Sequence, residues 1–528
     1  MTGISLMVEQ PVADSPRLPH QRELFIGLVG AVGTDLQAVS DALHEALEVL
    51  DYTVVPIRIS TLLHGITKWA GLASTQFEDE RIQQHMNAGD ELREMIGTDA
   101  VALLAVTAIA DARDSLTSSP GSTPPRVAYV LNSLKHPSEI TALRELYGPG
   151  FVLVAAYAPR EARITRLASR IAASRNAAQS QAFRQQAEAI NQRDEADVEK
   201  PFGQNVRDTF PLADAFLDAG DADALRRSAA RLIELLFGHP FHTPTRDEYG
   251  MYLASAAALR SASLGRQVGA AIATSDGDVV ALGTNEVPKA GGGLYWEGDS
   301  PDQRDFQLGY DSNDRIKRSV FIDILERLKT ASWPDPDGAS GLLDTLITQT
   351  RADDDPPHMK GAHFLNLIEF GRVVHAEMAA LMDAASRGAA VRSATLYSTT
   401  FPCHDCAKHI VAAGIRRVVY VEPYPKSLAP DLYLDSIAVD ATPSSCEGHV
   451  QFRPFVGVAP RRYIDLFTMP ARKEKGKRVE WKKAAATVRF PSAVGYLERE
   501  KATATEFLKR LVEKGLRYER TKGGERNA

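Results

Sequence analysis

The sequence predicts an α/β protein with two domains, a parallel-sheet domain followed by a three-layer α/β/α domain. With 528 residues, the chain is too long for one ordinary hydrophobic core. Short apolar runs alternate with helical patterns in the first half, which is typical of a parallel sheet covered by helices on both faces. In the second half a strand hairpin precedes a helix, a strand, a helix and a strand, which predicts the three-layer arrangement.

The first domain is expected at residues 21–239, behind a disordered tail at residues 1–20 whose acids and prolines do not suit a signal peptide. Short apolar runs are its expected strands: residues 24–29, 52–57, 126–132, 151–159 and 213–219. Residues 34–50 carry apolar side chains at helical spacing and predict the helix after the first strand. The polar segment 174–200 suits a helical or mobile lid over the sheet and equally a solvated helix, and the sequence leaves both open.

The stretch GLVGAVGTD at residues 27–35 lies between an expected strand and an expected helix, where a phosphate-binding loop belongs. A complete loop has a lysine after its last glycine and then Ser or Thr, but Thr34 and Asp35 stand there. ATP turnover is therefore not expected. Backbone N–H groups could still hold a phosphate, and the candidate residues are Gly27, Gly30, Gly33 and Thr34. A scaffolding domain and a nucleotide sensor both remain open.

The second domain is expected at residues 240–470, with an insertion at about 294–372. A helix at 247–260 precedes two strands that the turn SDGD joins. The remaining elements are expected in chain order: a helix that holds His375, a strand at 393–400, a helix from Cys403 and a strand at 416–424. A basic C-terminal extension follows at 471–528, with one helix at 493–516.

Two stretches of the second domain, VVHAEMAAL and TTFPCHDCAKHI, together indicate a catalytic zinc site. His375, Cys403 and Cys406 provide three ligands, and a structural zinc site normally has four. The free position is the one that water occupies in catalytic zinc sites. Glu377, two residues past the histidine, is the candidate proton carrier. Cys446 is interpreted as a small buried residue, in preference to a second metal site with His449.

Residues 247–426 resemble the deoxycytidylate deaminases of the cytidine deaminase superfamily. The motifs that carry the resemblance are LASAAALRSASLGRQVGAAIA, GTNEVPKAGGG, HAEMAAL and PCHDCAKHIVAAGIRRVVYVEPY. The resemblance implies attack of zinc-activated water on C4 of cytosine, with Glu377 as the proton shuttle. It also implies that Asn285 contacts the sugar.

Basic residues of the same region match the phosphate-handling side of that family, although a surface role is equally open for each: Arg260, Arg266 and Lys289. Tyr424 and Pro425 are candidates for walling the base.

The first domain, including RDE at 193–195, resembles a degenerate P-loop nucleoside-phosphate kinase. Together, residues 21–470 resemble the bacterial anti-phage dCTP/dCMP deaminases. This resemblance implies depletion of dCTP and dCMP during phage infection, a homo-oligomer, and a nucleotide effector at the front domain. Some members of that family are inhibited by a small RNA, so a small inhibitory RNA is a candidate partner of the basic tail.

The net charge is −7, but residues 471–528 hold 17 Lys and Arg against 8 Asp and Glu, so the rest of the chain carries −16. This acidic body and the 7% aromatic content argue against the alternative of a polynucleotide cytosine deaminase, which needs a basic groove and stacking aromatics. A housekeeping dCMP deaminase with a regulatory front domain is a further alternative. A non-enzymatic zinc regulator would have no use for Glu377. Three cysteines and the lack of an 18-residue apolar run predict a cytoplasmic protein without a membrane span.

Overall fold

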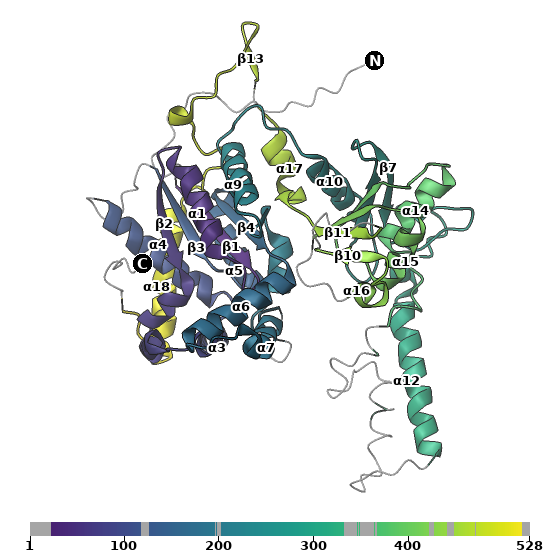
Figure 1. Cartoon of the computed structure of the whole chain (residues 1–528), viewed down its shortest axis with the longest axis horizontal. Helices are drawn as coiled ribbons and strands as arrows, with labels where there is room; N and C mark the ends of the chain where they lie inside the picture. Colours follow the sequence, from purple (N-terminus) through teal and green to yellow (C-terminus); the bar gives the residue numbers. More distant parts are fainter. Residues whose placement is uncertain are drawn as a thin grey trace. The chain divides into compact units, whose positions relative to one another are not determined.

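The computed structural model describes residues 23–117, 126–195, 197, 202–331, 346, 348, 364, 367–421, 427–440, 448–469 and 471–519. The chain divides into two compact units, each with its own six-stranded sheet (Figure 1). Unit 1 comprises residues 1–248, 422–424 and 456–528, and unit 2 comprises residues 249–421 and 425–455.

The sheet of unit 1 has the strand order β12-β5-β4-β1-β3-β2. Its strands are β1 (Leu24–Gly30), β2 (Thr53–Arg58), β3 (Val127–Asn132), β4 (Phe151–Tyr157), β5 (Ala215–Asp218) and β12 (Gly457–Val458). The first five pair in parallel, as the sequence predicted, and β12 adds an antiparallel edge strand to β5. The sequence did not predict β12, because two residues carry no periodic pattern.

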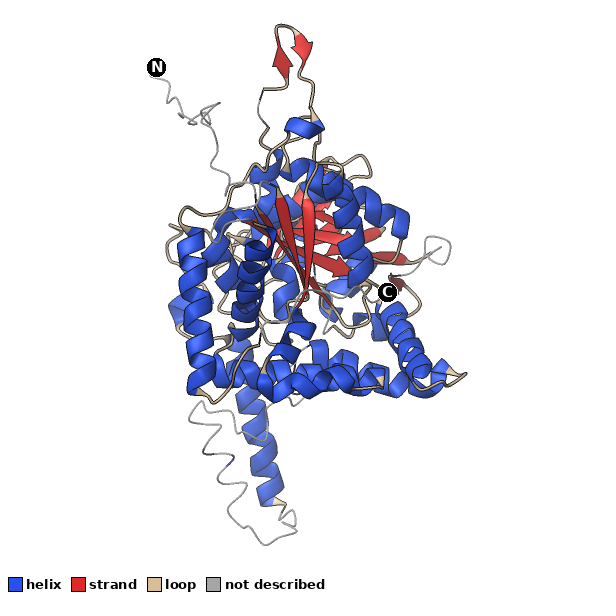
Figure 2. Ribbon diagram, turned by 90° about the vertical axis from the view of Figure 1, so that its left-hand side faces the viewer, coloured by secondary structure: helices blue, strands red, loops and turns tan. Residues whose placement is uncertain are grey.

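Helices cover both faces of this sheet (Figure 2). The α-helices of unit 1 are α1 (Leu36–Glu48), α2 (Ile59–Leu62), α3 (Glu78–Ile96), α4 (Ala100–Leu116), α5 (Pro137–Tyr147), α6 (Arg160–Ser174), α7 (Arg184–Glu195), α8 (Val206–Thr209), α9 (Ala222–Leu236), α17 (Pro460–Phe467) and α18 (Tyr496–Glu513). The 3₁₀ helices are η2 (Leu63–Gly65), η3 (Thr67–Ser74), η4 (Gly148–Gly150), η5 (Ser180–Phe183), η6 (Phe210–Leu212) and η10 (Lys483–Ala485). Within the described ranges no single helix is long and apolar enough to cross a membrane, although the bent pair α3 and α4, at 97°, passes that test together.

The alternation of side chains along β1 explains the two covered faces. Leu24, Ile26 and Leu28 lie in one buried cluster with apolar residues of α1 and α9. Phe25 points to the opposite face, where its ring stacks on Tyr147 with 3.7 Å between ring centroids. Both faces of β1 are thus buried, as expected for the central strand of a parallel sheet.

The C-terminal segment belongs to unit 1, which differs from the domain limit that the sequence suggested at residue 470. Arg113 Nε donates to Glu23 Oε1 at 2.9 Å, and the same guanidinium pairs with Glu500 of α18. Tyr147 Oη donates to Glu500 Oε2 at 2.7 Å. These charged groups are buried, so α18 completes their pairing and is an integral part of the unit. A charge count could not reveal this, because the paired residues lie at opposite ends of the chain.

The sheet of unit 2 has the order β10-β11-β9-β8-β6-β7. Its strands are β6 (Gly269–Ala273), β7 (Val279–Thr284), β8 (Thr395–Ser398), β9 (Arg417–Tyr420), β10 (Ile437–Val439) and β11 (Val450–Pro454). Its helices are α10 (Arg246–Ala258), α11 (Asp305–Leu308), α12 (Ser312–Thr330), α14 (Ala376–Ser386), α15 (His404–Ala412) and α16 (Ala429–Leu432). The hairpin β6–β7 and the parallel pair β8–β9 agree with the prediction, whereas β10 and β11 were not predicted.

Two glycines fix how closely helices lie on this sheet. A Cβ on Gly283 of β7 would meet the carbonyl oxygen of Ala376 in α14 at 2.1 Å. A Cβ on Gly269 of β6 would meet the carbonyl oxygen of Ala254 in α10 at 1.9 Å. Gly283 pairs with Ala270, which follows Gly269 in β6. Neighbouring side chains of a strand alternate between the faces, so α10 and α14 cover opposite sides of the sheet. The three-layer α/β/α arrangement is confirmed.

Candidate metal centre

The structure brings the two motif stretches together at the starts of two helices. His375 is the N-cap of α14, and Cys403 is the N-cap of α15, where its Sγ accepts from the backbone N–H of Cys406 at 3.4 Å. His375 Nδ1 lies 3.2 Å from Cys403 Sγ and 3.5 Å from Cys406 Sγ. All three ligating atoms lie within 4.8 Å of one another, as a shared metal ion requires.

The protonation of the two thiols fits a dication between them. The side-chain hydrogen bond with Cys406, followed by that with His375, lowers the pKa of Cys403 to about 4. The same hydrogen bond, together with burial, raises the pKa of Cys406 well above its ordinary value. Cys403 is thus the more acidic thiol of the two, and a dication would favour two thiolates. An imidazole and two thiolates suit Zn²⁺, and they are one ligand fewer than a structural zinc site uses.

Glu377 lies beside these donors and has no cationic hydrogen-bond partner among the described residues. Its side chain is buried, with 3% exposure. Oε1 accepts from Ser398 Oγ at 3.0 Å, and Oε2 accepts from Cys406 Sγ at 3.4 Å. Burial, as the largest cause, raises the pKa of Glu377. A buried carboxyl group with a raised pKa next to a metal position is suited to take up and release a proton.

Ser398 is a site residue that the sequence analysis missed. It is the last residue of β8, and its hydroxyl is fully buried against Glu377. Its position was the available signal, because polar residues at the carboxyl ends of parallel strands commonly line binding sites.

Asn285 directly follows β7, and its side chain is hydrogen-bonded to the backbone of the loop before β6. Oδ1 accepts from the N–H of Val268 at 2.7 Å, and Nδ2 donates to the carbonyl of Arg266 at 2.9 Å. The next residue, Glu286, pairs with Val374 through two backbone hydrogen bonds of 3.2 and 3.0 Å. Asn285 is therefore fixed near the chain segment that leads into His375. Its hydrogen bond to the Arg266 carbonyl also connects it to the backbone of that arginine.

Arg260 and Lys289 both contact the segment after β7. The Arg260 guanidinium lies over the ring of Trp296 at 3.5 Å, and burial lowers the pKa of the arginine. Lys289 Nζ pairs with Asp299 at 2.7 Å. Within the described residues, neither side chain has a hydrogen bond or ion pair with His375, Cys403 or Cys406, so a phosphate contact stays a prediction for both. Arg266 is exposed, whereas Tyr424, Pro425 and Cys446 lie outside the described residues.

The glycine loop of unit 1 is only partly the loop that the sequence suggested. Gly27 lies inside β1, where a Cβ would meet Leu134 at 2.6 Å, so this glycine serves packing. Gly30 ends β1, and Gly33 has a φ of +88° with Arg163 backbone behind it. Thr34 precedes the helix α1.

Comparison with known proteins supports the nature of the metal centre. Residues 244–422 match the family model of the cytidine and deoxycytidylate deaminase zinc-binding region. This part of the chain is therefore similar to the zinc-binding region of the cytidine and deoxycytidylate deaminases.

Two curated relatives are deoxycytidylate deaminases. The one from Enterobacteria phage T2 is 46% identical over 54 residues, which cover 10% of this chain and 29% of the phage protein. The one from Pongo abelii is 30% identical over 122 residues, which cover 23% of this chain and 63% of that protein. The matches thus span only part of each relative.

Two solved structures align over about the same share of the chain. A dCMP deaminase from the cyanophage S-TIM5, in complex with dCMP and dUMP, is 19% identical, with a TM-score of 0.21 over 40% of this chain and 98% of that one. A gluconokinase from Sinorhizobium meliloti 1021 is 15% identical, with a TM-score of 0.21 over 41% of this chain and 97% of that one.

Proposed function

We propose that unit 2 catalyses the hydrolytic deamination of free deoxycytidine nucleotides, dCMP and dCTP, to the corresponding deoxyuridine nucleotides and ammonia. His375, Cys403 and Cys406 would hold Zn²⁺, and Glu377 would carry the proton. The observation that carries the proposal is the buried carboxyl group of Glu377, which lies beside three zinc-type donors without being one of them. The names of the two curated relatives support dCMP as a substrate.

The proton has a defined route in this proposal. When bound, Zn²⁺ lowers the pKa of a water and polarises it for attack on C4 of the base. Glu377 would take one proton from that water and deliver it to N3 of the ring. It would then take the remaining proton of the attacking oxygen and deliver it to the amino group, so that the C4–N bond breaks, C4=O forms and ammonia departs. Ser398 donates to Glu377 Oε1 at 3.0 Å and so orients the carboxyl group throughout.

We extend the proposal to the setting of the reaction. The resemblance to anti-phage deaminases supports depletion of dCTP in the cytoplasm during infection, by a homo-oligomer. A housekeeping role in pyrimidine metabolism is the alternative. Measurement of dCTP pools in cells with and without the protein, before and after infection, distinguishes these roles, because a housekeeping enzyme would change the pools in uninfected cells.

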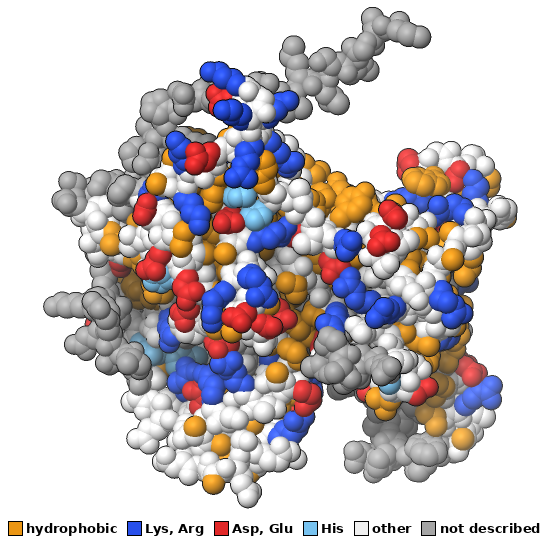
Figure 3. Space-filling view, turned by 45° about the horizontal axis from the view of Figure 1, so that its top comes forward, with side chains coloured by type: hydrophobic (Ala, Val, Ile, Leu, Met, Phe, Trp, Pro, Cys, Tyr) orange, Lys and Arg blue, Asp and Glu red, His pale blue; other side chains and the backbone are white. Residues whose placement is uncertain are grey.

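A polyanion such as a small inhibitory RNA is proposed as a partner of the C-terminal segment. Its hairpin of β13 (Lys473–Glu474) and β14 (Lys477–Arg478) is exposed, and basic side chains gather there (Figure 3). Exposed lysines and arginines are the groups through which proteins bind phosphate backbones. A shift in RNA mobility that disappears on charge reversal of this hairpin would support the partner, and unchanged binding would exclude the hairpin.

The deamination is tested with the purified full chain. It is incubated with dCMP, dCTP and a single-stranded oligonucleotide that contains deoxycytidine, while ammonia release and zinc content are measured. We expect activity on the free nucleotides and about one zinc per chain held by His375, Cys403 and Cys406. Activity on the oligonucleotide alone would replace the proposal with the polynucleotide alternative. A chain without zinc after isolation in the presence of the metal would remove its chemical basis.

A further inference from the structure

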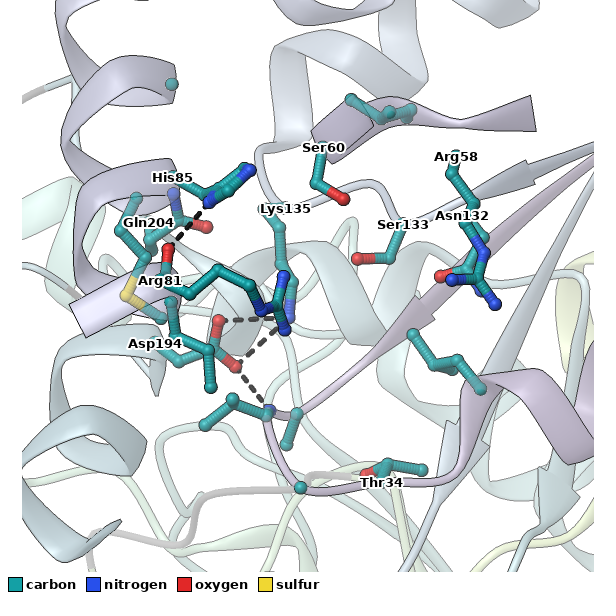
Figure 4. A pocket seen from close by; sticks show the side chains of 18 of the residues that line it. Thr34, Arg58, Ser60, Arg81, His85, Asn132, Ser133, Lys135, Asp194 and Gln204 are labelled. Carbon is teal, nitrogen blue, oxygen red and sulfur yellow. Dashed lines mark hydrogen bonds and ion pairs between the residues drawn. The ribbon is translucent and has the colours of Figure 1, made fainter. Parts of the chain in front are cut away.

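Unit 1 contains a cavity of about 430 Å³ beside the loop that follows β1 (Figure 4). Cavities of this size accommodate small ligands. Cationic side chains from several elements line it: Arg58, Arg81, Arg93, Lys135, Arg166 and Arg170. The carboxylates of its lining are only Asp35 and Asp194. Arg81 pairs with Glu78 and Arg93 with Glu139 outside the lining. The arginines that can receive a ligand are therefore Arg58, Arg166 and Arg170, and their charge points to an anionic ligand.

An internal carboxylate already fills the position where the loop would bind a phosphate. The N–H of Val32 donates to Asp194 Oδ2 at 2.7 Å. Lys135 Nζ lies 2.9 Å from Asp194 Oδ1 and donates to the carbonyl of Gly30 at 2.7 Å. Asp194 is fully buried. A loop amide and a lysine ammonium are the groups that hold a phosphate in a phosphate-binding loop, so Asp194 takes the place of that phosphate.

Lys135 also supplies in space the lysine that the loop lacks in sequence. It follows β3, about a hundred residues after the loop, yet its ammonium group reaches Gly30. No sequence pattern links the two segments. Its charge is neutralised by Asp194, so it is not available to stabilise charge on a transferred phosphoryl group.

Other groups of the cavity remain available to a ligand. Thr34 is 8% exposed and lines the cavity, and its Oγ1 has no hydrogen-bond partner within the described residues. Arg58 is exposed and donates a hydrogen bond to the neutral side chain of Gln37. Among the described residues it forms no ion pair. Apolar side chains form another part of the wall: Leu36, Ile59, Leu63, Ile82 and Met86.

At the rim, Arg166 and Arg170 are about half exposed, with side-chain exposures of 48% and 47%. Arg166 pairs with Asp35 and Arg170 with Glu78, and ion pairs whose arginine is this exposed are weak enough to exchange for a ligand. These arginines can therefore turn towards a phosphate at little cost.

We propose that this cavity binds a nucleoside polyphosphate, with its phosphates on Arg58, Arg166 and Arg170 and its base and sugar against the apolar wall. Asp194 keeps Lys135 and the Val32 amide occupied, so the ligand is bound and not turned over. Unit 1 is then a nucleotide sensor and not a kinase. This site is separate from the deamination site, and the inference does not depend on deamination.

The test is equilibrium binding of dGTP, ATP and pyrophosphate to the full chain, measured by calorimetry. None of these ligands contains cytosine, so the result is independent of the deaminase site. We expect saturable binding of one or both nucleotides, and weaker binding of pyrophosphate because it lacks the base. The double variant Arg166→Ala/Arg170→Ala should weaken nucleotide binding at least tenfold, since each removes a charge-assisted contact. The matched control is Arg226→Ala, an exposed arginine of α9 outside the cavity.

The variant Asp194→Asn tests the role of the internal carboxylate. Removing its charge frees Lys135 for the ligand, so nucleotide affinity should rise about tenfold or more, as for the gain of one charged contact. Weaker binding by a folded Asp194→Asn protein would contradict the role of Asp194 as a competing anion. Should this variant not fold, the rim variant still decides. The proposal is overturned if neither nucleotide binds at millimolar concentration, if the rim variant binds as the parent does, or if pyrophosphate binds as tightly as the nucleotides.

Discussion

Each unit buries a carboxylate beside its candidate site, and the partners of the two carboxylates differ. Glu377 in unit 2 meets the neutral hydroxyl of Ser398 and the thiol of Cys406. Asp194 in unit 1 meets the ammonium group of Lys135 and a backbone N–H. A buried carboxyl group without a cation has a raised pKa and can exchange protons, whereas one paired with an ammonium group acts as a fixed internal counterion. The same type of side chain thus suits proton exchange in unit 2 and neutralisation of a buried cation in unit 1.

The largest expected effect is on the reactive carboxylate. Glu377→Gln removes the proton carrier but keeps the size of the side chain, so kcat for deamination should fall by about 10²- to 10⁴-fold. Zinc content should stay unchanged, because Glu377 is outside the three-ligand group. The matched control is Glu369→Gln, an exposed position. Full activity with bound zinc in Glu377→Gln would show that Glu377 does not carry the proton. The difference in role between Glu377 and Asp194 would then be lost.

The next effect concerns the counterion role in unit 1. Glu500→Ala leaves the buried Arg113 with one carboxylate fewer, which should destabilise unit 1 by about 3–5 kcal/mol. Glu498→Ala on the exposed side of the same helix is the control. Chemical unfolding followed by hydrogen exchange should show earlier opening of unit 1 and unchanged protection of β6 to β9 in unit 2. Equal loss in both units would mean that they do not unfold separately.

A smaller effect is expected when packing behind the metal ligands is disturbed. Gly283→Ala places a Cβ 2.1 Å from the carbonyl oxygen of Ala376, so α14 must shift away from β7. Overpacking of this kind costs about 1–3 kcal/mol. Because His375 caps this helix, zinc affinity should fall as well. Gly71→Ala, with no atom within 4 Å of the new Cβ, is the control. Unchanged zinc affinity together with lowered stability would separate helix position from metal binding.

The smallest effect is a pH dependence confined to unit 1. His64 Nε2 and His85 Nε2 are 2.8 Å apart, and burial, as the largest cause, lowers the pKa of both. In the unfolded chain both have a pKa near 6.5, so the unfolded state binds protons first. Stability of unit 1 should therefore fall as pH decreases through about 6.5. Urea unfolding between pH 7.5 and 5.5 measures the slope, and His85→Gln should flatten it. An equal slope in parent and variant would assign the pH dependence to other groups.

The sequence predicted what depends on local pattern. The strands β1 to β9 follow apolar runs, and the candidate metal ligands are recognisable because His375 and Cys403 stand at helix starts with a short spacing to their partners. Contacts between distant segments were not predictable in this way. Lys135 approaches Gly30, and Glu500 approaches Arg113, through the course of the chain in space. No periodicity in the sequence records such approaches, so the pairing of Lys135 with Asp194 and the role of α18 became visible only in the structure.

The division of the chain has a consequence for synthesis on the ribosome. Unit 1 is made from residues 1–248 and 456–528, so unit 2 is interposed within it. Strand β12 and Glu500, the second of the two carboxylate partners of Arg113, leave the ribosome only after all of unit 2 has emerged. Since domains fold as they appear, the interposed unit can reach its native state while its host still lacks an edge strand and a counterion. Interrupted translation would then leave a folded metal centre attached to an incomplete sheet.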